Sequence, residues 1–309
     1  MFKLPSPIQQ VELGILSEKG VELWVKRDDL IHPEVSGNKW RKLKFSFEKS
    51  KREQLSPIIS FGGAFSNHLA ALAAAGKLFN FPTIGLVRGE ESSQNNPTLK
   101  AAKEKGMELR FVSRSQYREK DILIKELKKE FRNALIIPEG GADVLGVLGC
   151  TEILKEVNEH FDVICAACGT GTTLAGLALS ASDDQNVLGF TAMKQGLQLV
   201  DRVDELMDRT IKAGFDRIHT HPYELATAYH FDGFAKVNDE LVEFMRNFTK
   251  LNGFYLDPVY TAKMFFGLFD MIERSIFPSG TRILAIHSGG LQGLAGMLYR
   301  GISIYPEAK

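Results

Sequence analysis

A candidate anion-binding loop is formed by five small residues, Gly169, Thr170, Gly171, Thr172 and Thr173. They follow an apolar run of strand length and precede an Ala- and Leu-rich segment typical of a helix. Backbone N–H groups and hydroxyls gathered at a helix N-terminus form a site for a phosphate. Leu177 stands where a Walker loop needs lysine, and Leu174 where a dinucleotide fingerprint needs its third glycine. A phosphate site outside both classes is predicted, with a plain tight turn as the alternative.

Lys39 is the second feature that could do chemistry. It lies two residues after Gly37 and begins a basic run of helical character, residues 39–44. A lysine amine that has lost its charge can act as a nucleophile or as a base. A solvated surface lysine is the competing interpretation, since most lysines are exposed. The residues alone leave both interpretations open.

Two further glycine-rich points complete a set of four. They are residues 62–68 (GGAFSNH) and 287–290 (HSGG), which join residues 36–39 (SGNK) and 169–173 (GTGTT). In open α/β sheets, ligands bind beyond the carboxyl ends of the strands, so loops that follow strands are where chemistry is expected.

Strands and helices that alternate along the chain must position these loops. Apolar runs predict strands over residues 58–61, 83–87, 109–112, 134–138, 163–167, 187–191 and 282–287, and helices follow over residues 67–76, 97–105 and 119–132. This alternation is the signature of βαβ units around a parallel sheet, so the fold class is α/β. The helix over 119–132 is predicted to be amphipathic, with Ile122, Ile124, Leu127 and Phe131 on its apolar face.

The composition narrows the classes of partner. At 309 residues the chain suits two lobes with a cleft, since domains usually hold roughly 100–200 residues. Its 38 basic and 38 acidic residues balance, so nothing favours nucleic acid, and a small molecule is the expected partner. Three cysteines are too few for a disulfide framework or structural zinc, which indicates a reducing compartment and no metal site. Cys165 and Cys168 have the spacing of a redox pair, but two buried thiols explain them better.

Neither export nor membrane insertion is indicated. Residues 1–7 lack the basic and apolar regions of a signal peptide. Residues 163–182 carry no charge over about the length that spans a bilayer. The GTGTT loop interrupts this stretch, which reads better as a buried strand, a turn and a helix. We therefore expect a cytoplasmic protein without a membrane partner.

The motifs, taken in order, resemble one enzyme family. The string VKRDDLIHPEVSGNKWRKLKF at residues 25–45 is followed by GGAFSNHLAALAAAG, PEGGAD, GTGTT, LDPVY and HSGG. This order is similar to that of the D-cysteine desulfhydrase and 1-aminocyclopropane-1-carboxylate (ACC) deaminase family of pyridoxal-phosphate enzymes, and the likeness extends from Leu4 to about Leu298. The resemblance implies the tryptophan-synthase-β-like fold (fold type II), two open-sheet α/β lobes with the cofactor between them. The larger lobe would combine residues 1–51 with 150–309, and the smaller would hold residues 52–149.

The resemblance also implies roles for single residues. Lys39 would carry pyridoxal phosphate as a Schiff base and later remove the α proton of the substrate. The GTGTT loop would hold the cofactor's phosphate, and Asn67 its phenolic oxygen. Ser66, with the backbone near Asn67 and His68, would receive the substrate carboxylate.

Within the family that the sequence resembles, the residues that contact the pyridine ring differ between the ACC deaminases and the D-cysteine desulfhydrases. At the position of Thr261 the ACC deaminases carry a glutamate, and at that of Ser288 a leucine, so these two hydroxyls resemble the desulfhydrase pattern. A neutral hydroxyl, chiefly that of Ser288, would then face the ring nitrogen. Tyr260 matches the family's active-site tyrosine and could give or take a substrate proton, with a buried structural tyrosine as the alternative. The roles of His68 and His287 stay open.

The predicted function is α,β-elimination from D-cysteine or a related small amino acid, giving pyruvate, ammonia and sulfide. ACC deaminase is the alternative on the same fold, and a non-catalytic pyridoxal-phosphate-binding protein is the third hypothesis. The family also implies a homodimer.

Overall fold

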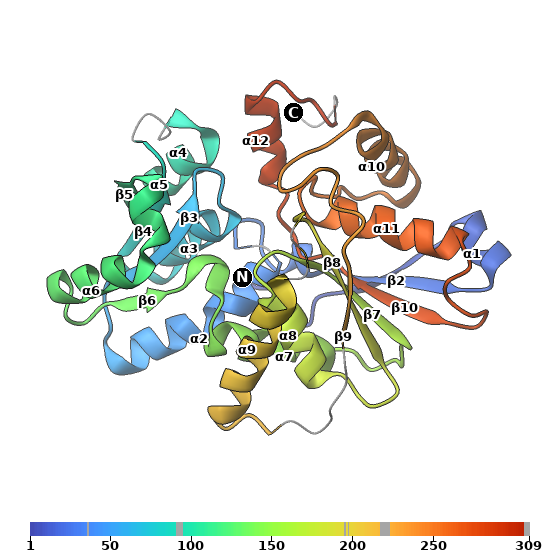
Figure 1. The fold of residues 1–309 in the computed structure, drawn as a ribbon, viewed down its shortest axis with the longest axis horizontal. Coiled ribbons are helices and arrows are strands. Elements are labelled where there is room, and N and C mark those ends of the chain that lie inside the picture. Colours follow the sequence, from blue (N-terminus) through green and yellow to red (C-terminus); the bar gives the residue numbers. More distant parts are fainter. Residues whose placement is uncertain (36, 91–94, 195, 197, 217–222, 306–309) are drawn as a thin grey trace.

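Two sheets, each flanked by helices, build the two lobes of the computed structural model (Figure 1). It describes residues 1–309 apart from 36, 91–94, 195, 197, 217–222 and 306–309. The larger sheet has the strand order β1-β2-β10-β7-β8-β9 and the smaller the order β5-β4-β3-β6. All neighbouring strands are parallel except β1 and β2. The strands are β1 Ile8–Val11, β2 Glu22–Lys26, β3 Ile58–Gly63, β4 Thr83–Arg88, β5 Glu108–Val112, β6 Leu135–Ile137, β7 Val163–Cys168, β8 Asn186–Thr191, β9 Tyr223–Ala226 and β10 Arg282–Ile286.

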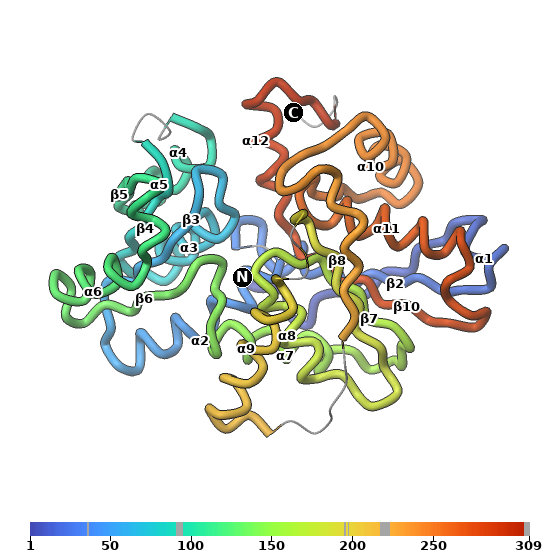
Figure 2. Tube along the Cα trace, viewed as in Figure 1, coloured from blue at the N-terminus to red at the C-terminus, as the bar shows by residue number. Residues whose placement is uncertain are grey.

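Helices connect the strands and cover both sheets, as the chain trace shows (Figure 2). In the part of the chain described they are α1 Gly14–Lys19, α2 Asn38–Glu53, α3 Asn67–Phe79, α4 Pro97–Glu104, α5 Arg114–Arg118, α6 Lys120–Glu130, α7 Val144–Lys155, α8 Thr172–Ser180, α9 Gln198–Lys212, α10 Asp239–Asn252, α11 Thr261–Glu273 and α12 Gly293–Tyr299, with 3₁₀ turns η1 Asp28–Leu30 and η3 Glu139–Gly141. The predicted α/β class is confirmed, and each of the seven predicted strands is present.

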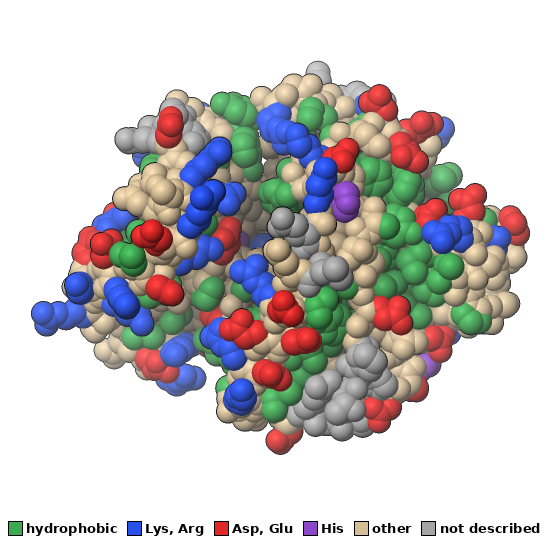
Figure 3. Space-filling view, in the orientation of Figure 1, with side chains coloured by type: hydrophobic (Ala, Val, Ile, Leu, Met, Phe, Trp, Pro, Cys, Tyr) green, Lys and Arg blue, Asp and Glu red, His purple; other side chains and the backbone are tan. Residues whose placement is uncertain are grey.

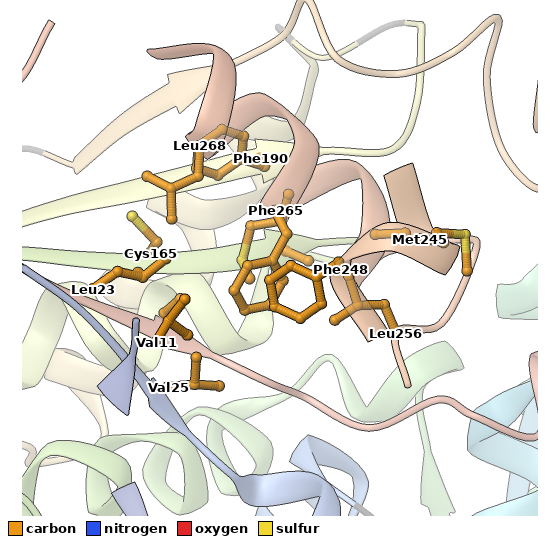
Figure 4. Close-up of a cluster of buried hydrophobic side chains, with 14 of the residues drawn as sticks. Val11, Leu23, Val25, Cys165, Phe190, Met245, Phe248, Leu256, Phe265 and Leu268 are labelled. Carbon is orange, nitrogen blue, oxygen red and sulfur yellow. The ribbon is translucent and has the colours of Figure 1, made fainter. Parts of the chain in front are cut away.

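The centre of the larger lobe is a cluster of buried aliphatic and aromatic side chains between its sheet and the helices α10 and α11 (Figure 4). Strand β7 contributes to the cores on both faces of the sheet, because successive strand residues point to opposite sides. Cys165 belongs to one core and Cys168 to the other. Both thiols are unpaired, and burial raises the pKa of each. The redox-pair alternative is therefore wrong.

The uncharged stretch over residues 163–182 forms β7, the glycine loop and α8. Its strand and helix are fully packed between other elements of the larger lobe. Among the described residues, no helix is both long enough and apolar enough to cross a membrane.

The predicted amphipathic helix over 119–132 differs from the structure in its bounds and its buried face. Helix α6 ends at Glu130, and a separate short helix, α5, precedes it. Leu123 and Leu127 are buried, whereas Ile122 is 50% exposed. Since residues four apart lie on one helical face, Leu123 and Leu127 define the inner side, and the predicted position of Ile122 there is wrong.

Helix α2 joins the two lobes. Its apolar side chains Trp40, Leu43 and Phe47 pack in the core of the smaller lobe, although the predicted division assigns residues 1–51 to the larger one. On another side of the helix, Arg41 is buried between Asp28 and Glu156. The lobe boundaries stay a prediction. This packing indicates that α2 contributes to both lobes.

Gly149 allows α2 and α7 to approach closely. A Cβ atom at residue 149 would overlap the backbone carbonyl of Arg41. Backbone cannot move aside as a flexible side chain can, so a larger residue must separate the two helices.

We expect Gly149→Ala to lower the free energy of unfolding by about 1–3 kcal/mol, the usual cost of overpacking. Chemical denaturation of both proteins measures the difference. Gly293→Ala is the matched control, because nothing lies within 4 Å of a Cβ atom there. Equal stability of the two variants would contradict the packing argument.

Candidate active site

Lys39 lies in the first turn of α2, directly behind a tightly built turn. Gly37 has a φ of 61°, and a Cβ atom at this residue would overlap the backbone oxygen of Ser288. The N–H of Gly37 donates to the carbonyl of Asp28, and the N–H of Asn38 donates to that of Ser288 at 3.2 Å. The start of α2 is thereby fixed to the HSGG turn of the larger lobe. Ser36 lies outside the described residues.

The amine of Lys39 is prepared for chemistry near neutral pH. Burial lowers its pKa to about 7, and the positive charge of Lys42 acts in the same direction. Its Nζ donates to Oδ1 of Asn38 at 3.0 Å, and Nδ2 of Asn38 donates to Oγ1 of Thr173 at 3.0 Å. Asn38 thus connects the candidate nucleophile to the candidate phosphate loop.

Lys42 is a buried lysine next to Lys39 on α2 that the sequence interpretation missed. Its side chain is 4% exposed and makes no hydrogen bond or ion pair within the part of the chain described. Burial lowers its pKa. A buried charge without a partner is costly, so the side chain favours its neutral form until an anion binds beside it. Its spacing of three residues from Lys39 places both lysines on one face of α2, and this spacing could have revealed it.

The GTGTT loop has the geometry of an anion site. Gly171 has a φ of 83° and leads directly into α8, whose first N–H groups have no acceptor within the helix. Thr172 and Thr173 are buried in the first turn, and the hydroxyls of Thr170 and Thr172 are 3.0 Å apart. Gly169 packs against the ring of Tyr260, since a Cβ atom there would lie 2.9 Å from Cε1 of the ring.

Tyr260 precedes α11 and stays protonated. Burial raises the pKa of its phenol, and the charges of Asp257 and Glu139 raise it further. A neutral phenol can donate a hydrogen bond to a bound group.

The loop between β3 and α3 offers donors for a carboxylate. Ser66 caps α3 by accepting from the N–H of Leu69 at 3.2 Å, which leaves its own hydroxyl proton to donate. The N–H groups of Asn67 and His68 at the helix N-terminus have no acceptor among the described residues. The side-chain nitrogen of Asn67 lies close to Gly290 of the HSGG turn, 3.0 Å from the position of a Cβ atom there.

The side chain of His68 is fixed in one tautomer. Oγ of Ser60 donates to the carbonyl of Ile137 at 2.8 Å, so its contact of 2.8 Å with Nε2 of His68 requires Nε2 to carry the hydrogen. Nδ1 is buried without a partner. Burial, Lys39 and Lys42 together lower the pKa of the imidazole to about 3, so it stays neutral. The backbone N–H of His68, rather than its ring, is available to a carboxylate.

Thr261 and Ser288 differ in whether their hydroxyls are free. Oγ1 of Thr261 donates to Oδ2 of Asp257 at 2.8 Å and accepts from the N–H of Asp257 at 2.9 Å. The predicted cofactor contact of Thr261 is therefore not supported, because its only proton is used in capping. The hydroxyl of Ser288 makes no hydrogen bond within the described chain. His287 donates to the carbonyl of Tyr255 at 2.8 Å and has a structural role.

The four glycine-rich loops thus meet at one place between the lobes. The turn η3 closes it from the smaller lobe, where Gly140 lies against Thr170 and Gly141 lies against Lys42 and His68. The face shown in Figure 3 is hollowed between the lobes, and lysine and arginine side chains gather beside the hollow.

Comparison with known proteins identifies this arrangement. Residues 3–289 match the family of pyridoxal-phosphate-dependent enzymes. The chain belongs to this family. It is 32% identical over 301 residues to a Pyrococcus horikoshii protein provisionally named as an ACC deaminase, covering 93% of this chain and 90% of that one. It is 31% identical over 320 residues to the Arabidopsis thaliana bifunctional D-cysteine desulfhydrase/ACC deaminase, covering 94% and 77%.

Solved structures of the family share the fold. An ACC deaminase homologue superposes with a TM-score of 0.84 at 29% identity, covering 98% of this chain and 95% of that one. A threonine deaminase of Solanum lycopersicum superposes with a TM-score of 0.69 at 17% identity, covering 97% and 82%. The predicted fold type II and the predicted cofactor, pyridoxal phosphate, are confirmed.

The site fits this cofactor. The unpaired side chain of Lys42, charged once an anion binds, and the N-terminus of α8 suit its phosphate, and the amine of Lys39 suits its aldehyde. Ser288 offers a hydroxyl for the ring nitrogen. We assign Lys39, Lys42, Asn67, Ser288 and the GTGTT loop to cofactor binding as a proposal drawn from this geometry.

Loading of the cofactor should depend on pH through Lys39. The lowered pKa means that the neutral, nucleophilic amine dominates above about pH 7 and falls about tenfold for each unit below it. Stopped-flow absorbance of pyridoxal phosphate mixed with apo-protein should give a rate that rises up to pH 7–8 and then levels. Lys39→Ala should abolish the borohydride-reducible band. A rate that keeps rising to pH 10 would show an ordinary lysine.

Lys42→Met should weaken pyridoxal-phosphate binding roughly 30-fold or more, because it removes one charge from a desolvated ion pair worth about 2 kcal/mol or more. Equilibrium titration by fluorescence measures the dissociation constant. Lys44→Met is the matched control, since that lysine pairs with Glu152 at the surface of the same helix. Equal effects of the two substitutions would remove Lys42 from the phosphate site.

Proposed function

We propose that the protein eliminates the β substituent of D-cysteine, or of a related small amino acid, to give pyruvate, ammonia and sulfide. The observation that carries this proposal is the hydroxyl of Ser288, which makes no hydrogen bond within the described chain. The carboxylate of Asp257 accepts four hydrogen bonds from residues 259–261, so its lone pairs are already used and it is not free to accept one from a protonated ring nitrogen. A neutral contact there supports the desulfhydrase pattern.

The side chains suggest how protons would move. Pyridoxal phosphate supplies the electron sink for the electrons of the broken Cα–H bond. The neutral amine of Lys39 would take the α proton onto Nζ. The protonated phenol of Tyr260 would give its proton to the departing thiolate. Ser66 and the N–H groups of Asn67 and His68 would hold the carboxylate and orient the substrate.

ACC deaminase is the second candidate. The names of several relatives and the TM-score of 0.84 with an ACC deaminase homologue support it. Ring opening of ACC cannot begin with removal of an α proton, because ACC has none, so it places a different demand on the groups around the ring. Thr261 and Ser288 argue for elimination.

We also propose a cytoplasmic location and a homodimer. The three unpaired, buried cysteines support a reducing compartment. Sedimentation at micromolar concentration would test the dimer, with an expected mass of twice 34.4 kDa.

Parallel assays decide between the reactions. Pyruvate release from D-cysteine and 2-oxobutyrate release from ACC are measured with the same holoenzyme, and Lys39→Ala serves as the inactive control. We expect kcat/KM to favour D-cysteine at least tenfold. Preference for ACC would overturn the assignment based on Ser288, and pyridoxal-phosphate binding without any turnover would identify a non-catalytic binding protein.

A further inference from the structure

A buried lysine of α11 holds a loop beside the candidate site. Lys263 is 1% exposed, and its Nζ donates to the carbonyls of His230 at 2.9 Å and Gly233 at 2.8 Å. It forms no ion pair with a carboxylate among the described residues. Its charge is therefore compensated by two backbone carbonyls, both in the loop of residues 229–235, which we call the clamp loop.

The clamp loop has an unfavourable backbone conformation. Phe231, Asp232 and Ala235 have φ values of 48°, 62° and 55°. Residues other than glycine rarely adopt positive φ values. Such a conformation persists only when surrounding contacts hold it. Lys263 supplies two of these contacts, and Arg300 supplies a longer one, 3.3 Å, to the carbonyl of Ala235.

The clamp loop presents Phe234 to Tyr260. The ring centroids are 5.8 Å apart with an interplanar angle of 65°, an edge-to-face contact. Phe234 is 56% exposed, so part of its ring stays open beside Tyr260. Tyr260 and Lys263 lie one turn apart at the start of α11, so one helix fixes both the tyrosine and the loop that covers it.

We propose that Lys263 is a positioning residue that holds the clamp loop, and through it Phe234, against Tyr260 to form a wall for the substrate side chain. The inference rests on the proposed function, which places Tyr260 beside the substrate. Phe234 has no hydrogen-bonding group, and sulfur packs favourably on aromatic rings. The wall therefore suits a thiol or apolar substituent better than a hydroxyl.

Lys263→Met tests the clamp, because methionine keeps much of the stem and removes the ammonium. Hydrogen exchange of residues 229–235 is measured on the holoenzyme without substrate and should become at least tenfold faster. The affinity for pyridoxal phosphate should stay within twofold. The KM for the amino acid should rise about tenfold while kcat changes less than threefold. Lys236→Met, an exposed lysine just after the clamp loop, should change none of these values.

A double-mutant cycle tests the route through Phe234. If Lys263 acts by holding that ring, Lys263→Met should raise KM much less in a Phe234→Ala background than in the wild type. Additive effects in the cycle would overturn the proposed route. Lys263→Gln provides a second variant should the methionine variant fail to fold.

Two results overturn the proposal directly. The first is unchanged hydrogen exchange in residues 229–235 of the Lys263 variants, and the second is faster exchange with unchanged KM. If the wild type turns over no amino acid, the proposed function fails by itself. Binding of D-cysteine, followed by the absorbance of the bound cofactor, then replaces KM, and absence of binding overturns the wall as well.

Discussion

Two lysine side chains on one turn of α2, Lys42 buried and Lys39 half-buried, have no carboxylate partner among the described residues, and the architecture around them holds them there. Desolvation lowers the pKa of both Lys39 and Lys42, which favours the neutral amine at each. An anion bound beside Lys42 would restore its ammonium form. The cation between them in sequence, Arg41, shows the contrast. It is buried, as Lys42 is, but ion-paired to both Asp28 and Glu156. The side of α2 that carries the ion-paired Arg41 has a structural role. The side that carries the unpaired Lys39 and Lys42 is the one proposed to bind the cofactor.

Much of the fold could be predicted because strands buried in a parallel sheet have nearly continuous apolar sequences. The seven strands found from sequence are of this kind. The missed strands β1 (IQQV), β2 (ELWVK) and β9 (YELA) mix polar and apolar residues. Two of them, β1 and β9, lie at the edges of the larger sheet, where one side of the strand has no neighbour. The glycine-rich loops were also visible in the sequence, since small residues after a strand mark the place where a ligand approaches.

The directions of single side chains could not be predicted in the same way. Thr261 and Ser288 are equivalent as hydroxyl residues in a motif, and only the structure shows that Asp257 already binds the first of them. His68 depends on Ser60, a residue of another element, for its tautomer. Lys263 looks like an ordinary helical lysine until the carbonyls of a loop thirty residues earlier are seen around its ammonium. Each of these facts depends on contacts between distant segments.

Helix α2 contributes to both lobes, with Trp40, Leu43 and Phe47 in the core of the smaller lobe and Arg41 tied to the larger one. A rotation of the smaller lobe that preserves both sets of contacts must therefore take place about this helix. Points close to a rotation axis move least, and Lys39 lies at the end of α2 that is fixed to the HSGG turn. A change in the separation of the lobes that preserved these contacts would leave the distance from the reactive amine to the GTGTT loop nearly unchanged.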